Sequence, residues 1–228
     1  MSRPFDQKQS LFKRVLSYFY PIKIEVVESE YSGQLEVTLQ NGKLVLNSPN
    51  ANYSFDSLHR VFQSVISDVI KIREDAPKEV LILGFGVGSI AHILKREKGI
   101  NCHITGVEID PAVIRLGEAY FGLDDYSNLK LLNTDALSFM SQTDIKADLI
   151  FVDLFINTEV DSNILKSDFY HQLSKALNRG KLAVINTMVQ RSELEALLDK
   201  LDAELGQELD ISHRNYYGEN EVIFLVKK

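Results

Sequence analysis

EVLILGFGVGSI, residues 79–90, combines a short apolar run with a turn of three glycines that leads into an amphipathic stretch. A near-continuous apolar run of this length predicts a strand that is buried on both faces. Gly84, Gly86 and Gly88 allow the backbone to approach a ligand at the N-terminus of the following helix. Alone, the turn is a weak signal, because its third glycine can serve only close packing of that helix.

Short apolar runs and amphipathic stretches alternate from this segment to the end of the chain. Strands are expected at 79–83, 102–108, 129–132, 148–152, 181–186 and 221–226, and helices at 57–72, 89–98, 111–121, 167–177 and 192–205. Parallel strands covered by helices on both faces form a doubly wound sheet. The predicted fold class is therefore α/β, with a Rossmann-like nucleoside-binding domain at residues 56–228.

Residues 1–55 are predicted to form a smaller unit, a helix followed by a β-hairpin. Apolar residues recur at helical spacing from residue 7 to 20, where a proline follows. Strands are expected at 22–27, 35–39 and 44–46. Asn41-Gly42 lies between the last two, and this pair tolerates the positive φ angles of a type I′ hairpin turn.

Charge and composition indicate which classes of molecule the protein is expected to bind. The chain has 228 residues and a formal net charge of −7, which opposes nucleic-acid binding through clustered lysine and arginine. No apolar run approaches the roughly 20 residues that span a bilayer. No signal-peptide pattern is evident at the N-terminus, so we expect a cytoplasmic protein with a small-molecule acceptor and neither nucleic-acid nor membrane partners.

Metal binding and disulfide formation are not expected. Cys102, the single cysteine, cannot form an internal disulfide or a thiolate-built zinc site, and it is predicted to be a buried structural thiol. The histidines show no metal-ligand spacing and are expected at the surface or just outside a ligand's direct contacts: His59, His92, His103, His171 and His213. Tyr216 and Tyr217 are expected in a helix-to-strand connection.

Acidic residues follow the second and third strands of the sheet. Glu108 comes twenty residues after Gly88, where a carboxylate can accept hydrogen bonds from both ribose hydroxyls. Asp110, followed by a proline, is assigned to capping the next helix. Asp135 can accept a hydrogen bond from the amino group of an adenine, with capping of the next helix as the alternative. Ile109 and Ala136, their neighbours, complete the candidate nucleoside site.

Asp153 follows the fourth strand. In an open sheet of order 3-2-1-4-5, the ligand crevice lies between strands one and four, so Asp153 faces the space beside the glycine turn. It is the candidate catalytic residue. The alternative is a capping or turn aspartate in an otherwise apolar segment.

The motifs VEID at 107–110, TDA at 134–136 and VDLF at 152–155, with the glycine turn, make residues 79–188 resemble spermidine synthases and their relatives. The resemblance implies the seven-stranded class I methyltransferase fold and a cofactor that is S-adenosylmethionine or its decarboxylated form. It places Glu108 on the ribose, Asp135 near the adenine and the glycine turn under the sulfur-bearing chain.

The chain departs from that family where the amine substrate is held. Val87 stands in place of the loop aspartate of GGGDG, and Ile156 replaces the second acid of D-x-x-D-P, which leaves Asp153. Leu58-His59-Arg60 likewise loses the tyrosine and glutamate of a Tyr-His-Glu pattern. Each lost charged hydrogen bond is worth roughly 1.5 to 3 kcal/mol. These losses argue against an ordinary polyamine site.

Three functions follow from these observations. The first is an S-adenosylmethionine-dependent transferase that methylates an unidentified nucleophile. The second is a divergent aminopropyltransferase that uses decarboxylated S-adenosylmethionine and a polyamine. The third is a non-catalytic nucleoside-binding or assembly protein, and NAD binding is a remote fourth, because Ser89 displaces the third glycine of that fingerprint. The exposed edges of the N-terminal hairpin predict a homodimer.

Overall fold

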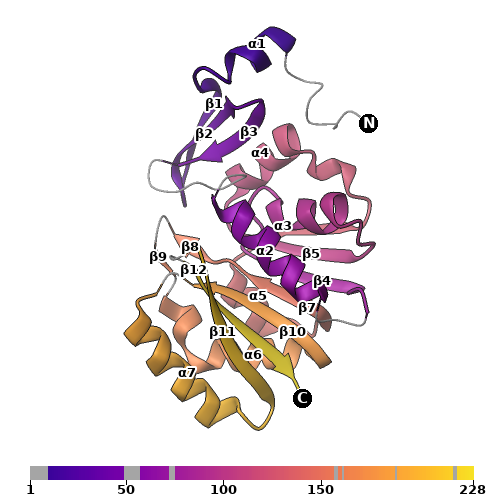
Figure 1. The fold of residues 1–228 in the computed structure, drawn as a ribbon, viewed down its shortest axis with the longest axis vertical. Helices are drawn as coiled ribbons and strands as arrows, with labels where there is room; N and C mark the ends of the chain where they lie inside the picture. Colours follow the sequence, from indigo (N-terminus) through magenta and orange to yellow (C-terminus); the bar gives the residue numbers. More distant parts are fainter. Residues whose placement is uncertain are drawn as a thin grey trace.

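A seven-stranded sheet of order β11-β12-β10-β7-β4-β5-β6 forms the centre of the protein (Figure 1). The computed structural model describes residues 10–48, 57–71, 75–156, 159–160, 162–187, 189–217 and 220–228. The strands are β4 (Glu79–Leu83), β5 (His103–Glu108), β6 (Leu129–Asn133), β7 (Ala147–Val152), β10 (Leu177–Thr187), β11 (Leu209–Tyr216) and β12 (Asn220–Lys227). Strands β6, β5, β4, β7 and β10 are parallel, whereas β12 is antiparallel to both its neighbours. The predicted α/β class and the 3-2-1-4-5 order are confirmed.

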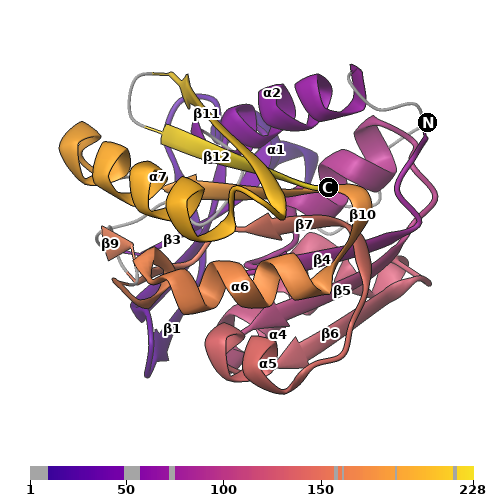
Figure 2. The same ribbon diagram turned by 90° about the horizontal axis from the view of Figure 1, so that it is seen from below.

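Helices cover both faces of this sheet (Figures 1 and 2). They are α2 (Ser57–Lys71), α3 (Ser89–His92), η2 (Ile93–Glu97), α4 (Pro111–Phe121), α5 (Ala136–Gln142), α6 (Ser167–Ala176) and α7 (Arg191–Leu205). One apolar core joins α5, α6 and α7 to the sheet, and a second joins α2, α3 and η2 to it. Because strand side chains alternate, β4 contributes Leu81 and Leu83 to the first core and Val80 and Ile82 to the second.

The remaining short elements connect these layers. They are η3 (Leu123–Asp125), β8 (Phe155–Ile156), β9 (Glu159–Val160) and η4 (Ser162–Leu165). Cys102 is a buried free thiol, in agreement with its predicted structural role. In the part of the chain that the structure describes, no helix has both the length and the apolarity needed to cross a bilayer.

The N-terminal unit is helix α1 (Leu11–Leu16) with an antiparallel sheet of β1 (Ile22–Ser29), β2 (Gly33–Gln40) and β3 (Lys43–Asn47), at one end of the molecule (Figure 1). Asn41 and Gly42 have φ angles of 49° and 73°, so the predicted type I′ hairpin is confirmed. Leu35, Val37 and Leu46 pack from this sheet against α4. The predicted boundary between residues 55 and 56 lies outside the described residues.

Helix α1 is shorter than the helix predicted from residue 7 to 20, whose first three residues lie outside the described ranges. Three of its apolar side chains are exposed, those of Leu11, Phe12 and Val15. Helical spacing predicts an apolar face, but only tertiary packing decides whether the same chain covers it.

Two segments of the Rossmann-like domain differ from their prediction. Residues 209–216 form β11, which the apolar pattern does not indicate because only the two end residues of this strand are buried. Tyr216 and Tyr217 therefore lie in the β11-β12 hairpin rather than in a helix-to-strand connection. The helix predicted at 89–98 changes after His92 into the π-helix η2, a distortion that is frequent at functional sites.

Candidate active site

The glycine turn lies at the carboxyl edge of the sheet, between β4 and α3. Gly84, Gly86 and Gly88 have φ angles of 78°, 57° and 91°, which residues with a Cβ rarely adopt. A Cβ at Gly84 would overlap the backbone carbonyl of Asp153. The turn therefore packs directly against the end of β7, the strand that carries the candidate catalytic residue.

Glu108, the candidate ribose ligand, is held by two main-chain amides. The N–H of Gly86 donates to Oε2 at 2.8 Å, and the N–H of Asp110 donates to Oε1 at 3.0 Å. Burial raises the pKa of Glu108, and the two backbone hydrogen bonds oppose that rise. Each carboxylate oxygen can accept a further hydrogen bond. The side chain is thus fixed in place with acceptor capacity left for a pair of ribose hydroxyls.

Asp135 is the N-cap of α5. Its Oδ1 accepts from the N–H of Ser138 at 2.7 Å, so the capping alternative is observed, and contact with an adenine stays a prediction. Ala136 is buried. Ile109 is 38% exposed next to Glu108, so it presents an apolar surface at the edge where the nucleoside is predicted.

Asp153 follows β7 and is half-buried, and its backbone carbonyl lies against Gly84 of the glycine turn. Its Oδ1 accepts a 2.9 Å hydrogen bond from Nδ2 of Asn186, a fully buried residue near the end of β10. The pKa of Asp153 is raised to about 6. Burial is the largest cause, the charge of Glu108 adds to it, and the Asn186 hydrogen bond opposes both. A carboxyl group with a pKa close to neutral is suited to accept a proton during catalysis.

Asn186 is a site residue that the sequence analysis missed. The available signal was its position at the end of an apolar strand, LAVIN, in the strand predicted to lie beside the strand that precedes Asp153. A buried asparagine at the end of an apolar run needs a partner, because an unpaired polar group is costly to bury.

The charge at this edge of the sheet is negative. Lysine and arginine are absent from the described residues that end the five parallel strands: 84–88, 108–110, 134–136, 153–156 and 186–187. Among the described residues, no lysine, arginine or histidine shifts the pKa of Glu108 or Asp153. Such an edge favours positively charged groups of a ligand over negatively charged ones.

Val87, which stands where spermidine synthases typically have the loop aspartate, is buried in the apolar contact between the two units. It is 2% exposed and belongs to the cluster that includes Leu35 and Val37 of β2 and Leu116 of α4. A carboxylate at this position would therefore enter an apolar contact. The backbone of Ile156 lies in β8. The structure does not describe the side chains of Ile156 and Leu58.

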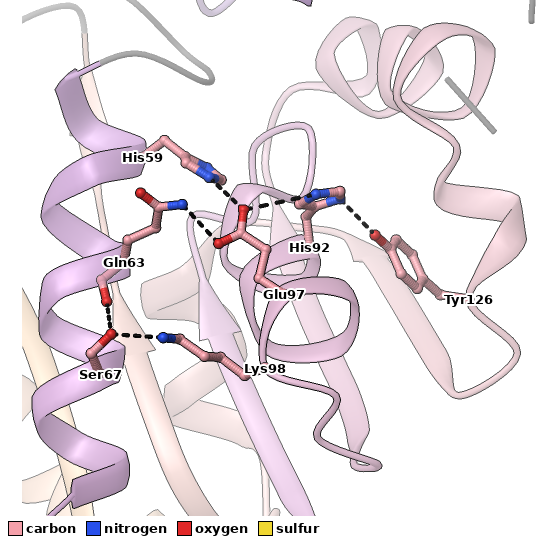
Figure 3. Close-up of polar contacts among 7 residues, drawn as sticks. All are labelled: His59, Gln63, Ser67, His92, Glu97, Lys98 and Tyr126. Carbon is pink, nitrogen blue, oxygen red and sulfur yellow. Dashed lines mark hydrogen bonds and ion pairs between the residues drawn. The ribbon is translucent and has the colours of Figure 1, made fainter. Parts of the chain in front are cut away.

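A polar network joins α2 to η2 (Figure 3). Nε2 of His59 lies 3.0 Å from Oε1 of Glu97, whose Oε2 accepts from Gln63 at 2.7 Å. His92 lies 3.9 Å from the same carboxylate and 3.4 Å from the hydroxyl of Tyr126. His59 is 8% exposed. It therefore does not lie at the surface, which was one of the two positions predicted for it from the sequence. Among the described residues, no three metal-ligating side chains cluster.

Comparison with known proteins identifies relatives of the chain. Residues 59–206 match the spermine/spermidine synthase domain family. A polyamine aminopropyltransferase from Serratia proteamaculans (strain 568) is 30% identical over 129 residues, which cover 54% of this chain and 45% of that protein. The chain thus matches less than half the length of this relative.

Solved structures share the fold. Spermidine synthase from Thermotoga maritima superposes with a TM-score of 0.66 at 14% identity, over 91% of this chain and 73% of that one. Human methyltransferase-like protein 13, in complex with SAH, superposes with a TM-score of 0.62 at 19% identity, over 76% and 83%. The family match spans more than half of the chain, so the chain belongs to the spermine/spermidine synthase domain family.

Proposed function

We propose that the chain transfers an aminopropyl group from decarboxylated S-adenosylmethionine to a small amine. The observation that carries this proposal is the pair of acids, Glu108 and Asp153, at an edge of the sheet where the described strand-end residues include no lysine or arginine. An amine acceptor and a sulfonium donor are both cationic, so this edge matches both. Membership of the family and the aminopropyltransferase relative support the same choice.

Some of the site residues bind the donor, and Asp153 takes part in proton transfer. Glu108 binds the ribose, Ile109 and Asp135 flank the adenine, and the turn at 84–88 lies beneath the sulfur-bearing chain. When bound, the sulfonium would supply an electrophilic carbon that an amine can attack; the N–C bond would form as the C–S bond breaks, and the sulfur would leave as the neutral thioether. Asp153 orients the attacking amine and accepts the proton that its nitrogen releases.

Methyl transfer, the first of the three hypotheses from the sequence, is less well supported than aminopropyl transfer. S-Adenosylmethionine carries a carboxylate that its decarboxylated form lacks, and the described strand ends offer it no lysine or arginine. The burial of Val87 removes one partner for the second ammonium group of a long polyamine. The proposed acceptor is therefore a short amine.

A competition titration tests the proposal. The protein is mixed with labelled 5′-methylthioadenosine, which is then displaced by S-adenosylmethionine or by its decarboxylated form. Tighter binding of the decarboxylated form, with transfer to putrescine or a monoamine detected by mass spectrometry, supports aminopropyl transfer. Preference for S-adenosylmethionine would favour methyl transfer, and binding of neither would leave the non-catalytic function.

A further inference from the structure

The turn between β1 and β2 is hydrogen-bonded to the end of β5, the strand that carries Glu108, the residue proposed to bind the ribose. Ser32 Oγ donates to Oδ2 of Asp110 at 2.6 Å, and Ser29 Oγ donates to the same oxygen. Asp110 is 2% exposed, and its Oδ1 caps α4 by accepting from Ala112 N–H at 2.8 Å. A residue that the sequence assigned only to capping thus also joins the N-terminal unit to the Rossmann-like domain.

The same residue continues the chain of contacts to Glu108. The main-chain N–H of Asp110 donates to Oε1 of Glu108, and the N–H of Gly86 donates to Oε2. The carboxylate of Glu108 is therefore oriented from one side by Asp110 and from the other by the glycine turn. Any shift of the Asp110 backbone changes where Glu108 points.

A second contact holds the glycine turn from the same unit. Val87, in that turn, is buried against Leu35 and Val37 of β2 and Leu46 of β3. The N-terminal sheet therefore contacts both supports of Glu108, the turn through Val87 and the strand end through Asp110. A sheet that contacts both the glycine turn and the strand end can set the orientation of Glu108, which lies between them.

We infer that Ser32, together with Ser29, is a positioning residue for ribose recognition, and that it acts through Asp110 on Glu108. The inference rests on the proposed function in one respect, the assignment of Glu108 to the ribose. It makes the N-terminal unit part of the nucleoside site, although this unit supplies none of the residues predicted to touch the nucleoside.

Two substitutions separate positioning from folding. Ser32→Ala removes one donor and leaves Ser29, which shapes the turn by accepting from two backbone amides. Asp110→Asn keeps the oxygen that caps α4 and the main-chain N–H, but it loses the carboxylate oxygen that both serines share. Ser10→Ala is the matched control, because Ser10 caps α1 in the same unit.

The test is the affinity for 5′-methylthioadenosine and for its 2′-deoxy analogue, measured by calorimetry. We expect Ser32→Ala and Asp110→Asn to weaken methylthioadenosine binding about tenfold, the effect of one disturbed charged hydrogen bond. Binding of the deoxy analogue should weaken much less, and Ser10→Ala should change neither. Equal weakening for both ligands, or none, would overturn the inference, since loss of folding does not distinguish a ribose hydroxyl.

If the unmodified protein binds neither nucleoside, the proposed function and the ribose assignment fail, but whether Ser32 positions Glu108 through Asp110 is still decided. Hydrogen exchange then measures the exchange rates of the Asp110 and Gly86 main-chain amides, which donate to Glu108. Faster exchange at both in Ser32→Ala, at unchanged melting temperature, supports the positioning of Glu108. Unchanged exchange at these amides contradicts it.

Discussion

Asn186 donates a 2.9 Å hydrogen bond to Asp153, from the end of β10 to the residue that follows the adjacent strand β7. The contact fixes the orientation of the carboxyl group that the proposed reaction needs. It also lowers the pKa of Asp153 against the effect of burial, and the pKa that results is about 6. Orientation and ionisation of this group thus depend on the same neighbour.

Asp153→Asn tests the proton acceptor. The variant keeps the size of the side chain but cannot accept the proton, so turnover should fall by a factor of at least about 100. Affinity for methylthioadenosine should change little, because Glu108 is untouched. Asp148→Asn, at the opposite end of β7, is the control and should keep its turnover. Full activity of Asp153→Asn would remove the residue from the mechanism.

The pH dependence of activity tests the role of Asn186. Only ionised Asp153 accepts a proton, so kcat/KM should fall as the pH drops through about 6. Asn186→Leu removes the hydrogen bond that lowers this pKa, and the acidic limb should move to higher pH. Thr187→Val, which loses a hydrogen bond to the carbonyl of Glu221 instead, should leave the limb in place. An unmoved limb in Asn186→Leu would contradict the assignment.

Val87→Asp restores the acid typical of spermidine synthases and tests whether this chain can hold it. The carboxylate would enter the apolar contact between the N-terminal sheet and α4, so the free energy of unfolding should fall by about 3 kcal/mol or more. Val87→Ala, which leaves only a cavity, should cost about 2 kcal/mol. Urea denaturation compares the two variants. Equal stability of Val87→Asp and the unmodified protein would show that position 87 faces the ligand.

His59 makes stability depend on pH. Burial lowers the pKa of His59, although Glu97 opposes the shift. The folded protein therefore binds fewer protons there than the unfolded chain, and the stabilisation is lost as the pH falls below the unfolded pKa of about 6.5. Between pH 7 and 5.5 the free energy of unfolding should fall less in His59→Gln than in the unmodified protein. Exposed His213→Gln is the control, and equal slopes for all three proteins would contradict the prediction.

The homodimer was predicted from the hairpin edges of the N-terminal unit, and it can be tested on the exposed residues from 11 to 20 of the same unit. Large apolar side chains are exposed along the residues from 11 to 20: Leu11, Phe12, Val15, Tyr18, Phe19 and Tyr20. An exposed apolar patch of this kind is typical of a contact surface. Sedimentation velocity at micromolar concentration should give a dimer, and Phe12→Lys with Phe19→Lys should give a monomer. A monomer before substitution would contradict the prediction.

Much of the site could be predicted because parallel strands bring their carboxyl ends to one edge. Gly84, Glu108 and Asp153 each follow an apolar run, so the strand order alone places them together. Asn186 follows such a run too, but an asparagine at a strand end has many ordinary roles, and only its 2.9 Å contact with Asp153 distinguishes it. Strand β11 was missed for a related reason, since its middle residues are exposed and carry no apolar alternation.

The sequence by itself determined the α/β class, the positions of the parallel strands along the chain and the acids at their ends, because local periodicity and strand-end position are encoded within a few residues. Only the tertiary structure decided what lies against those acids. The links from Ser32 to Asp110, from Val87 to Leu35 and from His59 to Glu97 join residues far apart in the chain. Burial and pKa depend on such contacts, and no local pattern specifies them.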